Sequence, residues 1–554
     1  PAPTPDVDEA ILKLEVTEDG MPTLRLGDVW LEDPEDPVKA SKAFVPPDVV
    51  QRADQIVLFG SGLGYRPLRL KSLGAKKVIV VEPIAEVLET ARGLLPTAFE
   101  GVTCVSRIDE LVDAVTLGGA SSDSVVLLSP PGYAEGYPKL HERVKEAIRD
   151  AQGFRKMRET SAEGRRAVVL ASGLASLEHA SGIPLALAAG EPLRGRPAFL
   201  VAAGPSLDRN RHLLRAARRK GAVFAVNTAA KALTEDLDVL DVLVRIEALG
   251  TSPELAAMAK RTRVLALDLV ADAATFALPT DRKALFVQEH EGLVPLADAL
   301  GASTLHYGAT VATAAFALAR AWGADPIVLV GQDLAYSEGR AYARGTGREG
   351  WSTVVEDGVI TIDYDEATER AFAEKGLALP HRSQPCLEVP AWGGGEKVVT
   401  TYDMALFRRW FEAAATHYEG RFVNATEGGA AIAGWEERTL EEILDELPDA
   451  PGADEAIVQA LDGAAGIGAS ALRRVRKEGA RRAKAVLEAA EKAGSRGPKA
   501  RAKAVTKAAA KAPLVLSHAS GALETLRRTG EDTAEKRSAA LLDSAQAVLA
   551  SLRG

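Results

Sequence analysis

Between about residues 196 and 335, short apolar runs alternate with stretches of helical periodicity. Each run contains a continuous apolar stretch, which is typical of a buried strand. Strands that alternate with helices in this way predict a parallel sheet of Rossmann type. The runs read "RPAFLVAAG", "AVFAVNTA", "DVLVRIEA", "RVLALDLV", "ALFVQEH" and "PIVLVGQD".

A second, smaller series precedes this one. "QIVLFGSGLGYRPLRLKSLGAKKVIVVEP" predicts a strand, a glycine-rich turn, a helix and a strand, and "SDSVVLLSPP" predicts a further strand. Residues 136–190 form a mostly helical connection, and from about residue 450 the composition shifts to Ala, Lys and Arg. We therefore predict an α/β chain with an N-terminal Rossmann-like domain over 1–150, a central α/β domain over 151–450 and an α-helical C-terminal domain over 451–554.

Composition limits the function. The chain has 554 residues and a net charge of -10, so we expect several domains and no nucleic-acid partner. Cys104 and Cys386 form neither a disulfide framework nor a metal-ligand spacing, which fits a reducing compartment. The most apolar long stretch is interrupted by Arg320, Asp325 and Pro326 and should not span a membrane. We expect a cytoplasmic protein.

The first glycine loop, "FGSGLGYRPL", places Gly60, Gly62 and Gly64 after a strand, and Glu82 ends the next strand. Glycines there let the backbone approach a nucleotide, and an acid there can accept hydrogen bonds from a ribose. The loop resembles the entry loop of S-adenosylmethionine-dependent methyltransferases. No methyltransferase catalytic motif follows, so we favour a structural Rossmann-like domain that has no cofactor.

The second turn, "AAGPSLD", lies between a strand and a helix. Gly204 permits a sharp turn and Pro205 fixes φ, while Ser206 and Leu207 begin the helix. Exposed N–H groups at a helix N-terminus favour an anion. The alternative is that Ser206 or Asp208 only caps the helix.

Polar residues also end the neighbouring strands. Because ligands of open parallel sheets lie outside the carboxyl ends of the strands, these residues should converge on one crevice. They are Asn227, Thr228, Glu247, Gln332, Asp333 and Tyr336.

Four segments together resemble the bacterial motility-associated factor (Maf) family. They are "AAGPSLD", "AVNTA", "GADPIVLVGQDLAY" and "FVNATEGGAAIAGWEERTLEEIL", and the resemblance runs from about Arg196 to Leu444. "LEDPEDPVKASKAF" and the first Rossmann-like unit extend it towards the N-terminus. Maf proteins are proposed flagellin glycosyltransferases. Their central domain is shared with archaeal 6-hydroxymethylpterin pyrophosphokinases and resembles bacterial sialyltransferases.

The resemblance implies transfer of a nonulosonic acid, of pseudaminic or legionaminic type, from its CMP-activated form to Ser or Thr of flagellin. Asp333, Tyr342 and Glu247 are the catalytic candidates; Tyr342 stands where the family has a histidine, and Glu247 where many relatives have aspartate. His306 is a substitute base. The candidate substrate-binding residues are Gly204, Pro205, Ser206, Leu207, Asn227, Thr228, Gly308, Thr310, Gln332, Asn424, Thr426, Glu427 and Gly428.

We expect no tightly bound cofactor and no metal, with a CMP-sugar as the donor and flagellin or another cytosolic protein as the acceptor. No G-x-x-x-x-G-K-[ST] motif occurs, so a P-loop kinase is not expected. Two alternatives stay open. One is a Mg²⁺-dependent 6-hydroxymethylpterin pyrophosphokinase, and the other is a non-catalytic flagellin-binding module.

The C-terminal helices are strongly basic. Residues 469–512 contain fourteen Lys or Arg and three Glu, a local charge of +11, and a break is expected at Gly497-Pro498. Such a run usually faces water. A docking surface for an acidic partner is the alternative.

Overall fold

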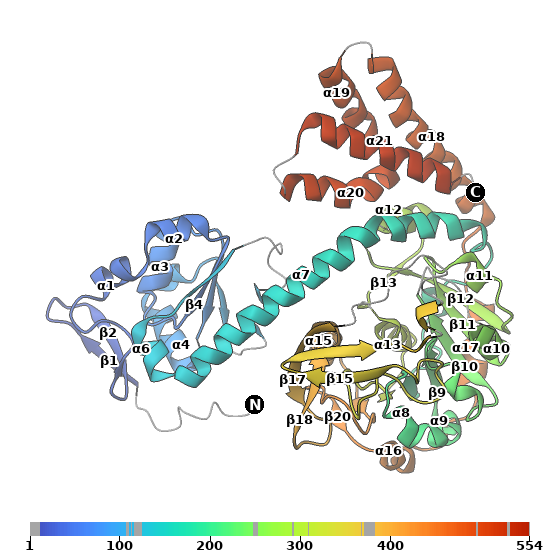
Figure 1. The fold of residues 1–554 in the computed structure, drawn as a ribbon, viewed down its shortest axis with the longest axis horizontal. Coiled ribbons are helices and arrows are strands. Elements are labelled where there is room, and N and C mark those ends of the chain that lie inside the picture. The colour runs from blue at the N-terminus through green and yellow to red at the C-terminus, as the bar shows by residue number, and fades with distance from the viewer. Residues whose placement is uncertain are drawn as a thin grey trace. The chain divides into compact units, whose positions relative to one another are not determined.

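The computed structural model describes residues 12–82, 84–106, 110–111, 114–115, 124–246, 253–290, 293–308, 310–366, 368–370, 383–494, 497–528 and 532–552 (Figure 1). The chain divides into two units, Pro1–Ser161 and Ala162–Gly554. This division and the predicted domain boundary near residue 150 both fall within one helix, α7 (Pro138–Ala175).

The first unit has two sheets. The parallel sheet has the order β6-β5-β4-β7, so the chain builds outward from β4 in one direction and then adds β7 on the other side. Its strands are β4 (Gln55–Phe59), β5 (Val78–Val81), β6 (Thr103–Val105) and β7 (Val125–Leu128). The helices are α1 (Pro37–Phe44), α2 (Pro47–Arg52), α3 (Tyr65–Ser72), α4 (Ala85–Leu94) and α6 (Pro131–Gly136).

A small antiparallel sheet, which was not predicted, precedes the first Rossmann-like strand. It consists of β1 (Leu12–Val16), β2 (Pro22–Leu26) and β3 (Val29–Trp30). Its alternating segments "LKLEV" and "TLRL" carry the signal, because one face of a strand is covered and the other is not.

The second unit is built on a nine-stranded parallel sheet of order β13-β12-β11-β10-β9-β8-β14-β19-β20. All six predicted strands are present, and the short strands β13, β19 and β20 were not predicted. The strands are β8 (Ala198–Val201), β9 (Ala222–Val226), β10 (Leu240–Arg245), β11 (Thr262–Asp268), β12 (Arg282–Gln288), β13 (Thr304–Leu305), β14 (Ile327–Val330), β19 (Phe422–Asn424) and β20 (Glu436–Glu437).

The middle of this sheet is buried on both faces, as the uninterrupted apolar runs predicted. Every residue of β8, β9, β10 and β14 is buried. Helix α13 (Val311–Ala321) is rich in alanine and packs against β8, β9 and β10, since small side chains allow a close approach. The Phe316 ring of α13 packs against Trp410 and Phe411 of α15 (Tyr402–His417). Other helices of the unit are α8 (Leu207–Asn210), α9 (Leu214–Lys220), α10 (Pro253–Ala259), α11 (Ala273–Phe276), α12 (Val294–Leu300) and α16 (Leu440–Glu446).

An antiparallel sheet lies between β14 and α15 in the chain and was not predicted. It contains β15 (Ser352–Glu356), β16 (Val359–Asp363), β17 (Ser383–Pro390) and β18 (Lys397–Thr401). Asp357 and Gly358 turn the chain between β15 and β16 with positive φ angles of 49° and 73°. An Asp-Gly turn between alternating segments is a hairpin signal that the sequence does carry.

The chain ends in helices, as predicted (Figure 1). They are α17 (Ala453–Asp462), α18 (Ala469–Gly494), α19 (Pro498–Ala509), α20 (Pro513–Arg528) and α21 (Ala534–Ser551). The predicted break at Gly497-Pro498 separates α18 from α19. The parallel sheets and the helical C-terminal region confirm the predicted fold class. Among the described residues, no helix has the length and apolarity needed to cross a membrane.

Trp322, at the end of α13, tests the packing of the central sheet. Its side chain is fully buried, and its Nε1–H donates to the Ala186 carbonyl oxygen at 2.9 Å. We expect Trp322→Ala to lower the free energy of unfolding by about 3–5 kcal/mol through the cavity that it leaves. Trp322→Phe should cost about 1–2 kcal/mol because it leaves the carbonyl unpaired. Urea denaturation checks both; equal stability of the two variants would contradict this role.

Candidate functional site

The central sheet reverses its direction of growth between β8 and β14. From β8 the chain adds β9 to β13 on one side and then returns to place β14 on the other. Such a switch point leaves a crevice at the carboxyl ends of the two strands, where α/β proteins bind ligands. The turn Gly204–Leu207 follows β8, and Gln332 and Asp333 follow β14, so two predicted segments meet there.

A direct contact joins the two turns. The Ser206 backbone N–H donates to Oδ2 of Asp333 at 3.0 Å, and its Oγ donates to Oδ1 of Asp333 at 2.6 Å. Both side chains are buried. The carboxylate of Asp333 therefore takes the place that the sequence analysis assigned to a bound anion. Burial raises the pKa of Asp333 to about 6, although the two hydrogen bonds from Ser206 oppose this shift.

Gly204 allows this contact through close approach rather than through turn geometry. Its φ is not positive, but a Cβ at this position would lie 2.0 Å from Oδ1 of Asp333. The capping alternative is wrong, since Ser206 makes no side-chain cap bond to α8. Asp208 does not cap the helix either; its carboxylate accepts hydrogen bonds from Arg340 at 2.7 Å and from the Arg344 N–H at 3.0 Å.

The "NATEGG" turn after β19 is tied to the same crevice. The Thr426 N–H donates to Oδ1 of Asn424, and Thr426 Oγ1 accepts from the Gln332 N–H, both at 3.3 Å. Glu427 has a φ of 61°, and its carboxylate accepts from Nδ2 of Asn210 at 3.1 Å. A Cβ on Gly428 would lie 3.1 Å from the Cβ of Ser206. The structure therefore brings this turn beside the Ser206 turn, as the predicted site requires.

Several buried polar atoms at these strand ends lack a partner among the described residues. Oδ1 of Asn227 after β9, Oε1 of Gln332 after β14 and Nδ2 of Asn424 in β19 make no hydrogen bond. Oδ1 of Asn210 in α8 is also unpartnered. Since buried polar groups are almost always hydrogen-bonded, these atoms indicate a place for a polar ligand or ordered water.

A charged network that the sequence analysis missed links the turns at this edge of the sheet. Arg209 donates to the Glu427 carbonyl oxygen and, at 3.0 Å, to Oε1 of Glu338. Arg340 donates to Oε2 of Glu338 at 3.2 Å as well as to Asp208. Arg209 and Asn210 lie within one helical turn of Ser206, which is the signal that could have found them.

Three other predicted residues cap a helix or pack against neighbouring side chains. Tyr342 packs edge-on against Trp351, and its hydroxyl accepts from Arg348 at 3.2 Å. Thr310 caps α13 by accepting from the Thr313 N–H at 3.2 Å. A Cβ on Gly308 would lie 3.0 Å from the Trp410 ring.

Three further candidates are Glu247, Thr228 and His306. Glu247 falls outside the described residues. Thr228 is half-buried beside Asn227. His306 is exposed, pairs with Glu289 at 3.3 Å, and follows β13, five strands from β8. At the usual strand spacing that is about 20–25 Å from the switch point, so His306 is too distant to act there.

The glycine loop of the first unit is filled by side chains of its own unit. Gly60, Gly62 and Gly64 all have positive φ, as the predicted loop requires. A Cβ on Gly60 would lie 2.3 Å from the Tyr133 ring, and one on Gly62 would lie 2.0 Å from Oε1 of Glu32. The Leu63 N–H donates to the same Glu32 oxygen at 2.9 Å. A carboxylate and an aromatic ring thus occupy the space that a nucleotide would need.

Glu82, the expected ribose acceptor, also has internal partners. Its Oε2 accepts from Tyr133 Oη at 2.6 Å, from the Ser61 N–H at 2.8 Å and from Ser61 Oγ at 3.0 Å. Burial raises the pKa of Glu82 to about 7, against the effect of these hydrogen bonds. This geometry gives a physical reason to expect a structural Rossmann-like domain without a cofactor. That expectation stays a prediction. Among the described residues, no three His, Cys, Asp or Glu side chains gather as a metal site would require.

Comparison with known proteins gives first a domain class. Residues 183–339 match the profile of the family described as 6-hydroxymethylpterin diphosphokinase MptE-like. This segment contains β8 to β14 and hence both sides of the switch point. No curated protein matches the chain.

The second finding covers the whole chain. The structure of the MAf glycosyltransferase from Magnetospirillum magneticum AMB-1 aligns with 99% of this chain and 92% of that chain, with a TM-score of 0.51 and 16% sequence identity. The chain therefore contains an MptE-like domain and has the fold of that Maf protein. Both findings confirm the resemblance stated from the sequence.

The burial of Asp333 predicts a pH-dependent stability. The pKa of Asp333 is about 6 in the folded chain and about 3.8 when unfolded, so the folded state holds a proton that the unfolded state loses. The stabilisation of the folded state by this proton is complete below pH 3.8 and is lost as the pH rises through about 6. As the pH rises from 4 to 7, the free energy of unfolding of Asp333→Asn should increase by about 1–3 kcal/mol relative to that of the parent. Urea unfolding at several pH values checks this; parallel curves would contradict it.

The filled glycine loop predicts that the first unit does not bind S-adenosylmethionine. Tyr133 and Glu32 would have to leave the loop before the ligand could approach Gly60 and Gly62. Isothermal titration of the full chain should give no binding heat. Micromolar binding that Glu82→Gln abolishes would overturn this expectation.

Proposed function

We propose that the chain is a glycosyltransferase that moves a nonulosonic acid of pseudaminic or legionaminic type from its CMP-activated donor to a Ser or Thr hydroxyl of flagellin. The observation that carries this proposal is the switch-point crevice, where buried polar atoms of Asn227, Gln332 and Asn424 have no partner in the part of the chain that the structure describes. The solved relative of the same fold is named as a glycosyltransferase, which supports the reaction class.

The Ser206 turn suits the phosphate of such a donor. A CMP-sugar carries one phosphate, and one N–H with one hydroxyl can bind it without a long phosphate loop. Both groups donate hydrogen bonds to the Asp333 carboxylate. The donor phosphate therefore displaces the Asp333 carboxylate from Ser206 as it binds. The oxygens of Asn227 and Gln332 are acceptors, which suits the amino group of cytosine.

The reaction then follows from these positions. The acceptor hydroxyl attacks the anomeric carbon, the bond from that carbon to the phosphate oxygen breaks, and CMP leaves with the bonding electrons. Ser206 donates hydrogen bonds to the departing phosphate and so stabilises its charge. The displaced Asp333 takes the proton of the attacking hydroxyl, and an adjacent phosphate raises the basicity of a carboxylate.

A diphosphokinase is the second candidate, because the matched family profile carries that description. It would bind ATP with Mg²⁺ and transfer diphosphate to a pterin. Parallel titrations with CMP and with ATP and Mg²⁺ separate the two functions. Donor binding without any transfer to flagellin would favour the third possibility, a non-catalytic flagellin-binding module.

Two variants of the Ser206–Asp333 pair should change donor affinity in opposite directions. Ser206→Ala removes a hydrogen bond to the phosphate and should weaken binding about ten- to a hundredfold. Asp333→Asn removes the competing carboxylate and should strengthen binding at pH 8 by about threefold or more, because a larger fraction of the chain is then competent. It should also abolish transfer. Calorimetry and a CMP-release assay measure both effects.

The titrated ligand should be a cytidine phosphodiester, whose charge does not change between pH 5 and 8. Parent affinity should fall as the pH rises through about 6, the pKa of Asp333, and Asp333→Asn should show no such fall. Thr262→Ser, which lies at the amino end of β11 and keeps the hydrogen bond to the Met258 carbonyl oxygen, is a control at the opposite edge of the sheet. Weaker donor binding by Asp333→Asn would rule out the exchange of carboxylate for phosphate.

A further inference from the structure

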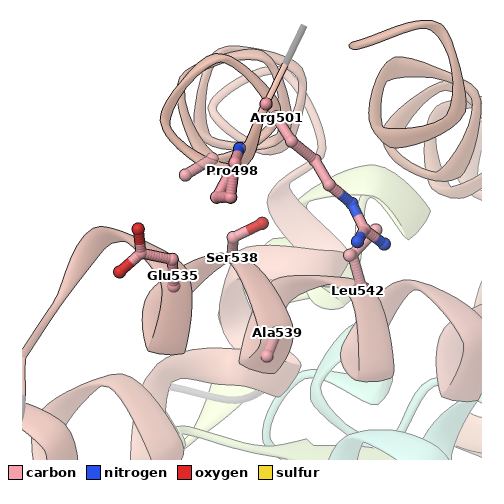
Figure 2. Close-up of a pocket in the computed structure, with 8 residues that line it drawn as sticks. Pro498, Arg501, Glu535, Ser538, Ala539 and Leu542 are labelled. Atoms are coloured by element: carbon pink, nitrogen blue, oxygen red, sulfur yellow. The ribbon is translucent and has the colours of Figure 1, made fainter. Parts of the chain in front are cut away.

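A hollow of about 260 Å³ lies between α19 and α21, in the C-terminal helices. Figure 2 shows Arg501 reaching from α19 towards Leu542 of α21, with the Ser538 hydroxyl directed into the space between the two helices. Glu535 borders the same hollow at the other side of Ser538. The rest of the lining is Gly497, Pro498, Ala502 and Ala539, so the hollow has an apolar wall with polar groups at its ends.

Three polar side chains of this hollow have no partner within the described part of the chain. Ser538 is 5% exposed and makes no side-chain hydrogen bond there. Arg501 and Glu535 line the same space and are exposed to solvent, and neither forms an ion pair with the other or with another described residue. A hydroxyl, a cation and an anion in one open hollow are therefore available to a ligand that supplies both an acceptor and a donor.

The surroundings favour an acidic partner. Helix α19 contains no Asp or Glu, and Lys499, Lys503 and Lys507 follow one another at intervals of four residues along its exposed side. These lysines span about 12 Å of the helix and have no ion pair among the residues described. Like charges at this spacing destabilise a helix. A field of one sign instead steers an oppositely charged partner.

We propose that the hollow between α19 and α21 is a docking site for an acidic segment of a partner protein. Arg501 and Ser538 bind a side-chain carboxylate of that segment, and Glu535 accepts a hydrogen bond from one of its N–H groups. Phosphodiesters and lipid phosphates fit less well, since they offer only acceptors and leave Glu535 without a donor. This site does not depend on the proposed transferase activity.

The test is binding of a fluorescent, end-blocked peptide of alternating Glu and Ala to the full chain, measured by anisotropy at low salt. The same peptide with Gln in place of Glu is the matched ligand control, and it should bind at least about tenfold more weakly. Arg501→Ala should weaken binding of the Glu peptide about ten- to a hundredfold, and Ser538→Ala should weaken it by less. Arg473→Ala, an exposed arginine at the start of α18, should leave affinity unchanged.

Competition distinguishes the occupants. A protein partner would be ruled out if phosphatidylserine vesicles, double-stranded DNA or inorganic phosphate bound more tightly than the Glu peptide and if this binding depended on Arg501. No peptide binding, or binding that Arg501→Ala and Arg473→Ala weaken equally, would overturn the site itself. Circular dichroism of each variant shows whether the helices remain folded.

Discussion

The contact between Ser206 and Asp333 determines how the central unit presents its ligand crevice. These residues follow β8 and β14, the two strands at which the sheet changes its direction of growth. Gly204 lies against the Asp333 carboxylate, while a Cβ on Gly429 would lie 2.3 Å from the Asp333 backbone oxygen, so two close backbone approaches enclose this one acid. Around it, the "NATEGG" turn and the Arg209 network attach β19 and the segment after β14 to α8.

The first unit repeats this logic with different residues. Its sheet changes direction between β4 and β7, and α6, the helix that follows β7, contains Tyr133. The tyrosine ring lies over Gly60 and its hydroxyl donates a hydrogen bond to Glu82, while Glu32 accepts a hydrogen bond from the Leu63 N–H. In each unit an internal carboxylate accepts hydrogen bonds that a nucleotide loop would otherwise offer to a ligand. Among the described residues, the central crevice also has buried amide atoms without partners, those of Asn227, Gln332 and Asn424.

Apolar periodicity predicted the major strands of both units, because burial on two faces leaves a local trace in the sequence. The short strands β13, β19 and β20 left no such trace, since a pairing of two or three residues is decided by distant neighbours. The candidate crevice was predictable for the same reason as the sheet: Ser206, Asn227 and Asp333 each end a recognisable strand. Their pairing was not predictable, because contact between residues 206 and 333 depends on strand order. The roles of Tyr342 and Thr310 were likewise set by packing against Trp351 and by the first turn of α13.

The glycines of the two loops affect how amino-acid substitutions in similar chains should be interpreted. Gly62 and Gly204 each face a carboxylate oxygen of their own unit at a distance that excludes a β-carbon. Their intolerance to substitution would therefore persist after loss of every ligand, as long as Glu32 and Asp333 remained. Such a glycine motif shows that another group lies close to the backbone. Only the neighbouring strand shows whether that group belongs to a substrate or to the chain itself.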